Sequence, residues 1–178
     1  MNPGEAERLW RELVREIPDF PTAGVGFKDI TPVLGHPGAF AACADGLAER
    51  FADAGVETVA AAEARGFIFG IPVAERLGAG FAAVRKPGKL PAATVGVEYA
   101  LEYGTDQLEM HVDSFAPGAR VLIVDDVLAT GGTARATCDL VERAGGQVVG
   151  CAFFVELAFL GGRRHLEGLR VESLLTYT

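Results

Sequence analysis

Short apolar runs alternate with longer stretches of helical periodicity through the middle of this chain. Four runs carry few polar side chains and read as strands: Val56–Ala62, Gly80–Val84, Arg120–Val124 and Gln147–Glu156. Two amphipathic patterns lie between them, Gly66–Leu77 and Thr133–Ala144. Uniformly apolar strands separated by amphipathic helices are typical of a parallel sheet that is covered on both faces. We therefore expect an α/β fold built on a parallel sheet flanked by helices.

The first 55 residues contain two further helical patterns. Apolar residues at helical spacing predict a first helix from Glu5 to Ile17, which the proline-containing sequence from Pro18 onward would end. A loop rich in glycine and proline follows and continues through Asp29. A second helix is expected over Pro37–Ala54, and Gly55 would close it.

Residues Pro87–Asp113 depart from this alternation. Polar and apolar side chains alternate there, as around Leu108 and Met110, and a turn is expected at Tyr103-Gly104-Thr105. This pattern predicts a two-stranded antiparallel excursion from the core, and long excursions often cover active sites. Because no repeat or composition shift divides the 178 residues, we expect one domain over residues 1–178, with the loop and hairpin at about 87–113.

Charge and apolar patterning exclude several classes of partner. The net charge is −8 without a basic run, whereas a nucleic-acid-binding protein needs clustered cations, so neither nucleic acid nor an anionic membrane is expected as a partner. The N-terminal sequence shows no secretory signal pattern, and no apolar stretch reaches the length that spans a membrane. The three cysteines are widely spaced, which favours buried thiols in a reducing compartment. We therefore expect a cytoplasmic protein.

The segment over residues 121–134 carries the strongest functional signal. Four apolar residues are followed by the adjacent carboxylates of Asp125 and Asp126, then by a loop with two glycines and two threonines, and then by a helix. Such a loop directs backbone N–H groups at a phosphate, and the helix N-terminus adds a favourable dipole. The two carboxylates can accept hydrogen bonds from vicinal hydroxyls, each contributing about 1.5–3 kcal/mol. The pattern favours a ribose 5-phosphate ligand.

The sequence Val-Asp-Asp-Val-Leu-Ala-Thr-Gly-Gly-Thr at 124–133 resembles the motif with which type I phosphoribosyltransferases bind phosphoribosyl pyrophosphate (PRPP), in the form of the adenine-specific branch. The resemblance implies that Asp125 and Asp126 hold the ribose hydroxyls. It assigns the 5-phosphate to five loop residues: Ala129, Thr130, Gly131, Gly132 and Thr133. It also implies the reaction, which is transfer of the 5-phosphoribosyl group of PRPP to adenine with release of AMP and pyrophosphate.

Two further segments resemble the same family. Glu63-Ala64-Arg65-Gly66-Phe67 is similar to the pyrophosphate loop, which implies a catalytic role for Arg65 as a ligand of the leaving group. Arg85-Lys86-Pro87-Gly88-Lys89 is similar to the segment between core and hood. This implies that Lys86 and Lys89 bind pyrophosphate and that Arg85 reaches into the site of a neighbouring subunit, as in a homodimer. Without the resemblance, three cations in five residues would favour a solvated loop.

The remaining matches concern the base. The segment 98–105 resembles the family's catalytic loop, which implies that Glu102 assists proton transfer at the purine; by itself, this pattern favours an exposed hairpin carboxylate. The adenine pocket is expected to include Gly26, Phe27, Lys28 and Leu157, although an aromatic ring or leucine there is equally typical of a core. The family often has an apolar residue in place of Gly26 and an arginine in place of Lys28.

The resemblance also implies Mg²⁺ as the cofactor, held mainly by PRPP, because the sequence shows no cluster of metal ligands at metal-binding spacing. Two alternatives remain. The first is a phosphoribosyltransferase for another base, such as xanthine, guanine or orotate. The second is a regulator that senses PRPP without catalysis, although such proteins carry a DNA-binding module for which this chain has neither a spare domain nor a basic surface.

Overall fold

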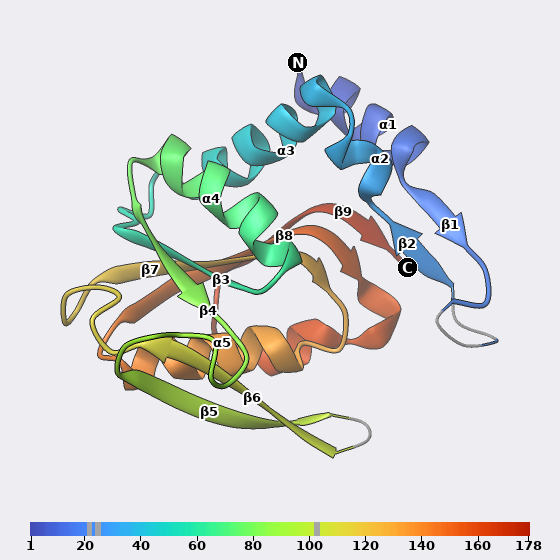
Figure 1. Cartoon of the computed structure of the whole chain (residues 1–178). Coiled ribbons are helices and arrows are strands. Elements are labelled where there is room, and N and C mark those ends of the chain that lie inside the picture. Colours follow the sequence, from blue (N-terminus) through green and yellow to red (C-terminus); the bar gives the residue numbers. More distant parts are fainter. Residues whose placement is uncertain (21–22, 24–25, 102–103) are drawn as a thin grey trace.

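A computed structural model describes residues 1–20, 23, 26–101 and 104–178 of the chain. Its centre is a five-stranded parallel sheet in the order β4-β3-β7-β8-β9 (Figure 1). The strands are β3 (Thr58–Ala62), β4 (Gly80–Val84), β7 (Arg120–Leu128), β8 (Gln147–Leu157) and β9 (Val171–Tyr177). Strands β3 and β7 lie inside the sheet and are almost entirely apolar up to Val124, as expected for strands that are covered on both faces.

Helices cover both faces of this sheet (Figure 1). One face packs against α1 (Pro3–Leu13), α2 (Thr31–Leu34), α3 (Pro37–Glu49) and α4 (Arg65–Leu77). The other face packs against α5 (Gly132–Arg143) and the hairpin of β5 (Thr94–Leu101) and β6 (Gly104–His111). Alternate residues of β7 serve the two sides, since Leu122 and Val124 face the four helices while Val121 and Ile123 face α5. The expected α/β fold is confirmed.

The N-terminal region differs from the prediction. Helix α1 ends at Leu13 rather than Ile17, because Arg15–Ile17 forms strand β1 and pairs with β2 (Phe27–Asp29), a segment predicted to be loop. The ion pair between Arg15 and Asp29, with 2.5 Å between nitrogen and oxygen, joins the two strands. The helical periodicity of the sequence does not reveal this pairing, since the partner strand lies ten residues further along the chain.

Helix α3 and strand β7 also have different ends from those predicted. Helix α3 ends at Glu49 rather than Ala54, although Phe51 remains fully buried in the turns that follow. Strand β7 continues to Leu128 instead of ending at Val124, since β8 pairs with it as far as Leu128 opposite Glu156. Asp125 and Asp126 are therefore strand residues, and only the loop that follows Leu128 leaves the sheet.

The excursion over residues 94–111 is the antiparallel hairpin that the alternating pattern predicted. Gly104 and Thr105 belong to β6 rather than to a turn, and Tyr103, the other residue of the expected turn, lies outside the described residues. The chain beyond Leu157, for which no element was predicted, forms two short 3-10 helices, η1 (Ala158–Leu160) and η2 (Gly162–Leu166), before β9. Among the described residues, no helix is both long enough and apolar enough to cross a membrane.

Candidate active site

A cavity of about 1070 Å³ lies beyond the carboxyl ends of β3, β7 and β8. Its wall contains most of the expected site residues, namely Gly26, Phe27, Lys28, Arg65, Asp125, Asp126, Ala129, Thr130, Gly131, Gly132, Thr133 and Leu157. These residues come from four separate stretches of sequence. The parallel sheet brings three of these stretches together because the carboxyl ends of its strands meet at one edge, and the stretch over residues 26–28 comes from the separate antiparallel pair of β1 and β2.

The two carboxylates at the end of β7 are the acidic centre of this cavity. Asp126 is buried, and its Oδ2 lies 2.6 Å from Arg65 Nε in an ion pair. No well-aligned hydrogen bond reaches this oxygen from the described part of the chain. A buried carboxylate oxygen that is held by an ion pair but receives no well-aligned hydrogen bond from the described residues can accept one from a ligand, and a hydroxyl would supply it. Asp125 Oδ1 accepts a hydrogen bond of 2.8 Å from the amide of Asp126, so the pair is locally ordered.

Helix α4 approaches this pair closely at Gly66. A Cβ at that position would lie 2.9 Å from Asp125 Oδ1, closer than real side chains come. The glycine lets the N-terminus of α4 sit against β7. Burial, together with repulsion from the neighbouring Asp126, raises the pKa of Asp125 well above the usual carboxyl range. Ionising both adjacent carboxylates is therefore unfavourable in this site. Carboxyl groups with a perturbed pKa often occur where a ligand binds.

Asp125→Asn is expected to stabilise the free protein at neutral pH by about 0.5–2 kcal/mol. Because the pKa of Asp125 is raised by folding, the unfolded chain loses this proton at lower pH than the folded chain, and stability falls as the pH rises between the two values. The gain should shrink as the pH falls toward about 4, where the unfolded carboxyl is also protonated. Denaturant unfolding at several pH values measures it, with Glu12→Gln on the exposed face of α1 as the control. Equal stability of variant and parent at neutral pH contradicts the prediction.

The loop after β7 presents backbone groups to the cavity. Gly131 caps α5 in the left-handed conformation, with φ +88°, which favours glycine, and no side chain among the described residues caps this helix. The first amides of α5 therefore lack partners within the helix, and they lie where the helix dipole favours an anion. Thr130 and Thr133 line the same wall and add hydroxyl donors. The loop has the form of a phosphate site.

Arg65 begins helix α4 and links two parts of the cavity. Its guanidinium pairs with Asp126 and lies over the ring of Phe27, 6.0 Å from the ring centroid. The side chain is 55% exposed, so its remaining donors face the open part of the cavity. A half-exposed arginine that is oriented by a buried carboxylate is well placed for an anionic group.

The cavity also has an apolar part. Besides Phe27 and Leu157, its wall contains Phe159, Leu160 and Tyr177, which sequence reasoning missed. Phe159 and Leu160 are exposed, and their only sequence signal was that the apolar run of β8 continues past Leu157. An exposed apolar wall of this kind suits a flat ring.

Lys28, which was expected in the base pocket, has its side chain fixed by other groups of the same wall. Its ammonium pairs with Glu16 at 2.8 Å and lies 4.6 Å from the centroid of the Tyr177 ring. These contacts connect β2 with β1 and β9. The side chain therefore has partners other than a ligand, and the backbone of Lys28 is the part that remains for binding.

The cations after β4 lie outside the wall that the described residues form. Arg85 Nε and Lys89 Nζ lie 2.9 and 3.5 Å from Glu63, whose carboxylate also accepts a hydrogen bond from the Lys86 amide. Burial by itself would raise the pKa of Glu63, but these contacts outweigh it and lower the pKa. The ammonium of Lys86 pairs with Asp106 on the hairpin. The structure thus places these three expected ligands beside the cavity, each with a carboxylate partner.

Glu102, the expected proton-transfer residue, lies outside the described residues. Strands β5 and β6, which flank it, are described, and their register pairs Leu101 with Gly104.

Comparison with known proteins identifies this arrangement. A model of the phosphoribosyl transferase domain matches residues 30–168, which include the acidic pair, the loop after β7 and the start of α4. The chain belongs to the phosphoribosyltransferase family. Among curated relatives of this phosphoribosyltransferase, the adenine phosphoribosyltransferase of Thermobifida fusca is 58% identical over 172 residues, which cover 97% of this chain and 98% of the relative.

Solved structures of other phosphoribosyltransferases agree with the fold. The adenine phosphoribosyltransferase of Thermoanaerobacter pseudethanolicus superposes with a TM-score of 0.93 and 52% identity, covering 96% of this chain and 99% of that one. The enzyme of Saccharomyces cerevisiae, solved with D-2,5-dideoxy-2,5-imino-altritol 1,6-bisphosphate and adenine, has a TM-score of 0.92 and 35% identity, with coverage of 97% and 99%. The fold and its connectivity are therefore those of adenine phosphoribosyltransferases.

Proposed function

We propose that this phosphoribosyltransferase transfers the 5-phosphoribosyl group of PRPP to adenine, with AMP and pyrophosphate as products. One observation carries the proposal: a single cavity joins an acidic pair, an uncapped helix N-terminus, a half-exposed arginine and an apolar wall. The acidic pair suits the ribose diol, the helix N-terminus suits the 5-phosphate, the arginine suits pyrophosphate and the apolar wall suits a purine. The near full-length likeness to adenine phosphoribosyltransferases supports the choice of adenine over other bases.

In this proposal the ribose phosphate lies over the end of β7. Asp125 and Asp126 accept hydrogen bonds from the two ribose hydroxyls, which gives Asp126 Oδ2 the well-aligned donor that the described residues do not supply. The backbone of the Ala129–Thr133 loop and the N-terminus of α5 hold the 5-phosphate. These contacts fix the sugar at both ends, so that its C1 atom faces the space between Arg65 and the apolar wall.

The leaving group is proposed to depart toward Arg65. Loss of pyrophosphate from C1 develops positive charge on the ribose ring and negative charge on the departing oxygens. Arg65 stabilises that negative charge. Lys86 and Lys89 also stabilise it once they leave their carboxylate partners, Asp106 and Glu63, and bind pyrophosphate instead.

Mg²⁺ is proposed as the cofactor of this step. No group of three potential metal ligands occurs among the described residues, whereas the phosphates of PRPP and the nearby carboxylates are the hard oxygen donors that this ion prefers. When bound to pyrophosphate, the ion neutralises negative charge on the leaving group. The protein's own contribution is to orient PRPP with Asp125, Asp126 and Arg65.

Adenine is proposed to lie against the apolar wall that includes Phe27 and Leu157, with N9 directed at C1 and with the backbone of Gly26 and Lys28 beside the base. Glu102 is proposed to move the purine proton during the attack. Closure of the Pro87–Leu101 loop over the site would exclude water, which otherwise captures the cationic sugar.

Glu102→Ala is expected to lower kcat by about 10²- to 10⁴-fold while changing the affinity for PRPP little, since a proton-transfer residue acts in the transition state. Steady-state kinetics together with direct PRPP binding separate the two effects. Glu98→Ala, on strand β5 of the same hairpin, serves as the control. Equal losses in kcat and in PRPP affinity contradict the assigned role.

A homodimer is also proposed, with Arg85 completing the site of the neighbouring subunit. Two observations support it. Ile68 and Ile71 leave large apolar side chains exposed on α4, 37% and 53% exposed respectively. Arg85, although paired with Glu63, keeps a side chain that is 34% exposed.

A base-competition assay tests the proposed reaction. Purified protein, PRPP and Mg²⁺ are incubated separately with adenine, guanine, hypoxanthine and xanthine, and both nucleotide and pyrophosphate are measured. The proposal expects AMP from adenine and no comparable product from the other bases. A different nucleotide would retain the PRPP site but overturn the base assignment. PRPP binding without any nucleotide product would favour a PRPP-sensing regulator.

A further inference from the structure

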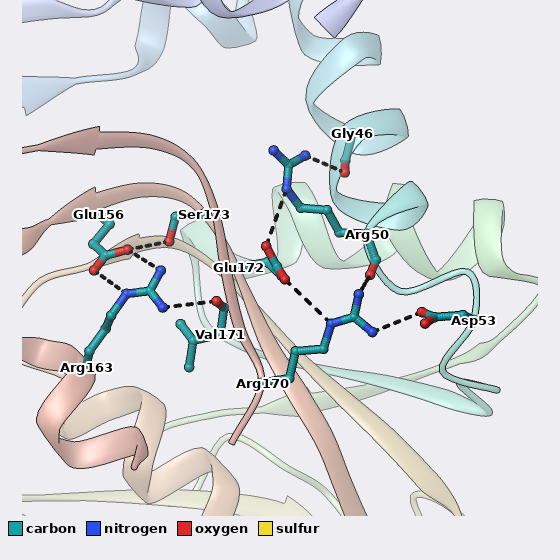
Figure 2. Close-up of polar contacts among 9 residues, drawn as sticks. All are labelled: Gly46, Arg50, Asp53, Glu156, Arg163, Arg170, Val171, Glu172 and Ser173. Carbon is teal, nitrogen blue, oxygen red and sulfur yellow. Dashed lines mark hydrogen bonds and ion pairs between the residues drawn. The ribbon is translucent and has the colours of Figure 1, made fainter. Parts of the chain in front are cut away.

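A buried carboxylate near the end of β8 takes no part in the proposed mechanism. Glu156 is 4% exposed and forms a two-pronged ion pair with Arg163, at 2.6 Å from Nε and 2.8 Å from the second terminal nitrogen (Figure 2). Ser173 of β9 donates a third hydrogen bond of 2.8 Å to the same carboxylate. The remaining terminal nitrogen of Arg163 donates to the carbonyl of Val171. Glu156 belongs to β8 and Val171 and Ser173 belong to β9, whereas Arg163 itself belongs to η2.

This network holds the residue that lies behind the proposed phosphate loop. Gly162 directly precedes Arg163, and a Cβ built on it would lie 2.2 Å from the carbonyl oxygen of Ala129. A Cβ built on Gly131 would in turn lie 2.4 Å from the carbonyl oxygen of Gly162. The two backbones are therefore in direct contact at both positions, and neither tolerates a side chain there. Any displacement of Gly162 must move the loop or open a gap behind it.

We infer that Arg163 is a positioning residue for the 5-phosphate loop, because its ion pair with Glu156 fixes the Gly162 backbone against Ala129 and Gly131. The inference deepens the proposed function and rests on the assignment of the 5-phosphate to the Ala129–Thr133 loop. Anion sites made of backbone amides bind well only when the amides already point at the ligand. The buried carboxylate supplies a fixed point on the sheet from which that orientation is set.

A second arginine close by in the fold provides the matched control. Arg170 precedes β9 and also holds its guanidinium on carboxylates and a carbonyl, with partners at Asp53, Glu172 and Arg50 (Figure 2). Its contacts join the sheet to the end of α3 and do not include the phosphate loop. Loss of either arginine removes a comparable set of polar contacts, but only Arg163 is adjacent to Gly162.

The test compares Arg163→Met, Arg163→Lys and Glu156→Gln with Arg170→Met. Calorimetric titrations with ribose 5-phosphate and with magnesium pyrophosphate report on the loop and on the Arg65 side separately. We expect Arg163→Met and Glu156→Gln to weaken ribose 5-phosphate binding on the order of 10- to 100-fold and to raise the KM for PRPP in parallel, with pyrophosphate binding and kcat much less affected. Arg163→Lys, which keeps the charge but not the planar fork, should recover part of the loss. Arg170→Met should leave both ligands bound as in the parent.

Two outcomes overturn the inference. One is an Arg163→Met protein that binds ribose 5-phosphate like the parent. Another is an equal loss for ribose 5-phosphate and pyrophosphate that follows the fall in melting temperature, because that is the behaviour of a merely structural contact. If Arg163→Met does not fold, Arg163→Lys and Glu156→Gln decide by the same two titrations. Thr133→Ala is measured alongside them: if it also leaves ribose 5-phosphate binding unchanged, the phosphate assignment fails and the inference fails with it.

Discussion

Asp126→Asn is expected to reduce kcat/KM for PRPP by about 100-fold. The variant keeps the shape of the side chain but replaces a charged acceptor with a neutral amide, and a hydrogen bond to a charged group contributes about 1.5–3 kcal/mol, or roughly 10- to 150-fold in rate. Asp126 Oδ2 is the buried oxygen that receives no well-aligned hydrogen bond from the described part of the chain, and it also orients Arg65. The substitution therefore weakens both the hydrogen bond to ribose and the orientation of Arg65.

Steady-state kinetics at saturating adenine measure this effect. Asp139→Asn is the matched control, since Asp139 pairs with Arg135 on the outer side of α5 and does not line the cavity. The control is expected to behave like the parent protein. A value of kcat/KM for Asp126→Asn within about threefold of the parent would show that neither the ribose contact nor the ion pair with Arg65 depends on the charge of this carboxylate.

Arg65→Gln is expected to lower kcat by about 10²- to 10³-fold, which is the usual loss when one stabilising group for developing negative charge is removed. The glutamine keeps the polarity and much of the length of the side chain but has no charge for the departing pyrophosphate. It also leaves the buried Asp126 without its ion-pair partner. Arg65→Lys should be intermediate, because it retains the charge without the planar fork.

The rate of pyrophosphate release reports this loss directly. Arg76→Gln is the control from the far end of the same helix, where Arg76 pairs with Asp45. An unchanged kcat with only a raised KM for PRPP would mean that Arg65 binds substrate and transition state equally. That result would remove Arg65 from the catalytic step.

The central part of the fold was predictable because its signals are local. Strand β4 was predicted with the bounds that the structure shows, and helix α4 within one residue, since short apolar runs and amphipathic patterns depend on neighbours in sequence. The loop over Ala129–Thr133 was predictable for the same reason, because strand, loop and helix follow one another directly. The structure places these residues in the cavity wall, and their binding of a phosphate stays a prediction.

The parts that were missed depend on contacts between distant segments. Strand β7 was cut short at Val124 because two charged residues interrupt its apolar run, whereas the neighbouring strand keeps the backbone extended. Strand β1 was assigned to a helix because its partner strand follows only after a loop. The pairing of Glu156 with Arg163 left no pattern in the sequence, and neither did the carboxylate partners of Lys86 and Lys89.

The construction of the cavity has a consequence for protein engineering. The wall near the acidic pair is carried by β3 and β7, which are interior strands of the five-stranded sheet. Apart from Leu157 of β8, the apolar wall comes from the edge strand β9 and from β2 and η1, which lie outside that sheet. Substitutions in the interior strands require repacking of the core on both faces of the sheet. Side chains outside those strands, such as Phe159 and Leu160, are already exposed. A mutant library aimed at a new acceptor base should therefore vary β2, η1 and β9 and leave the interior strands as they are.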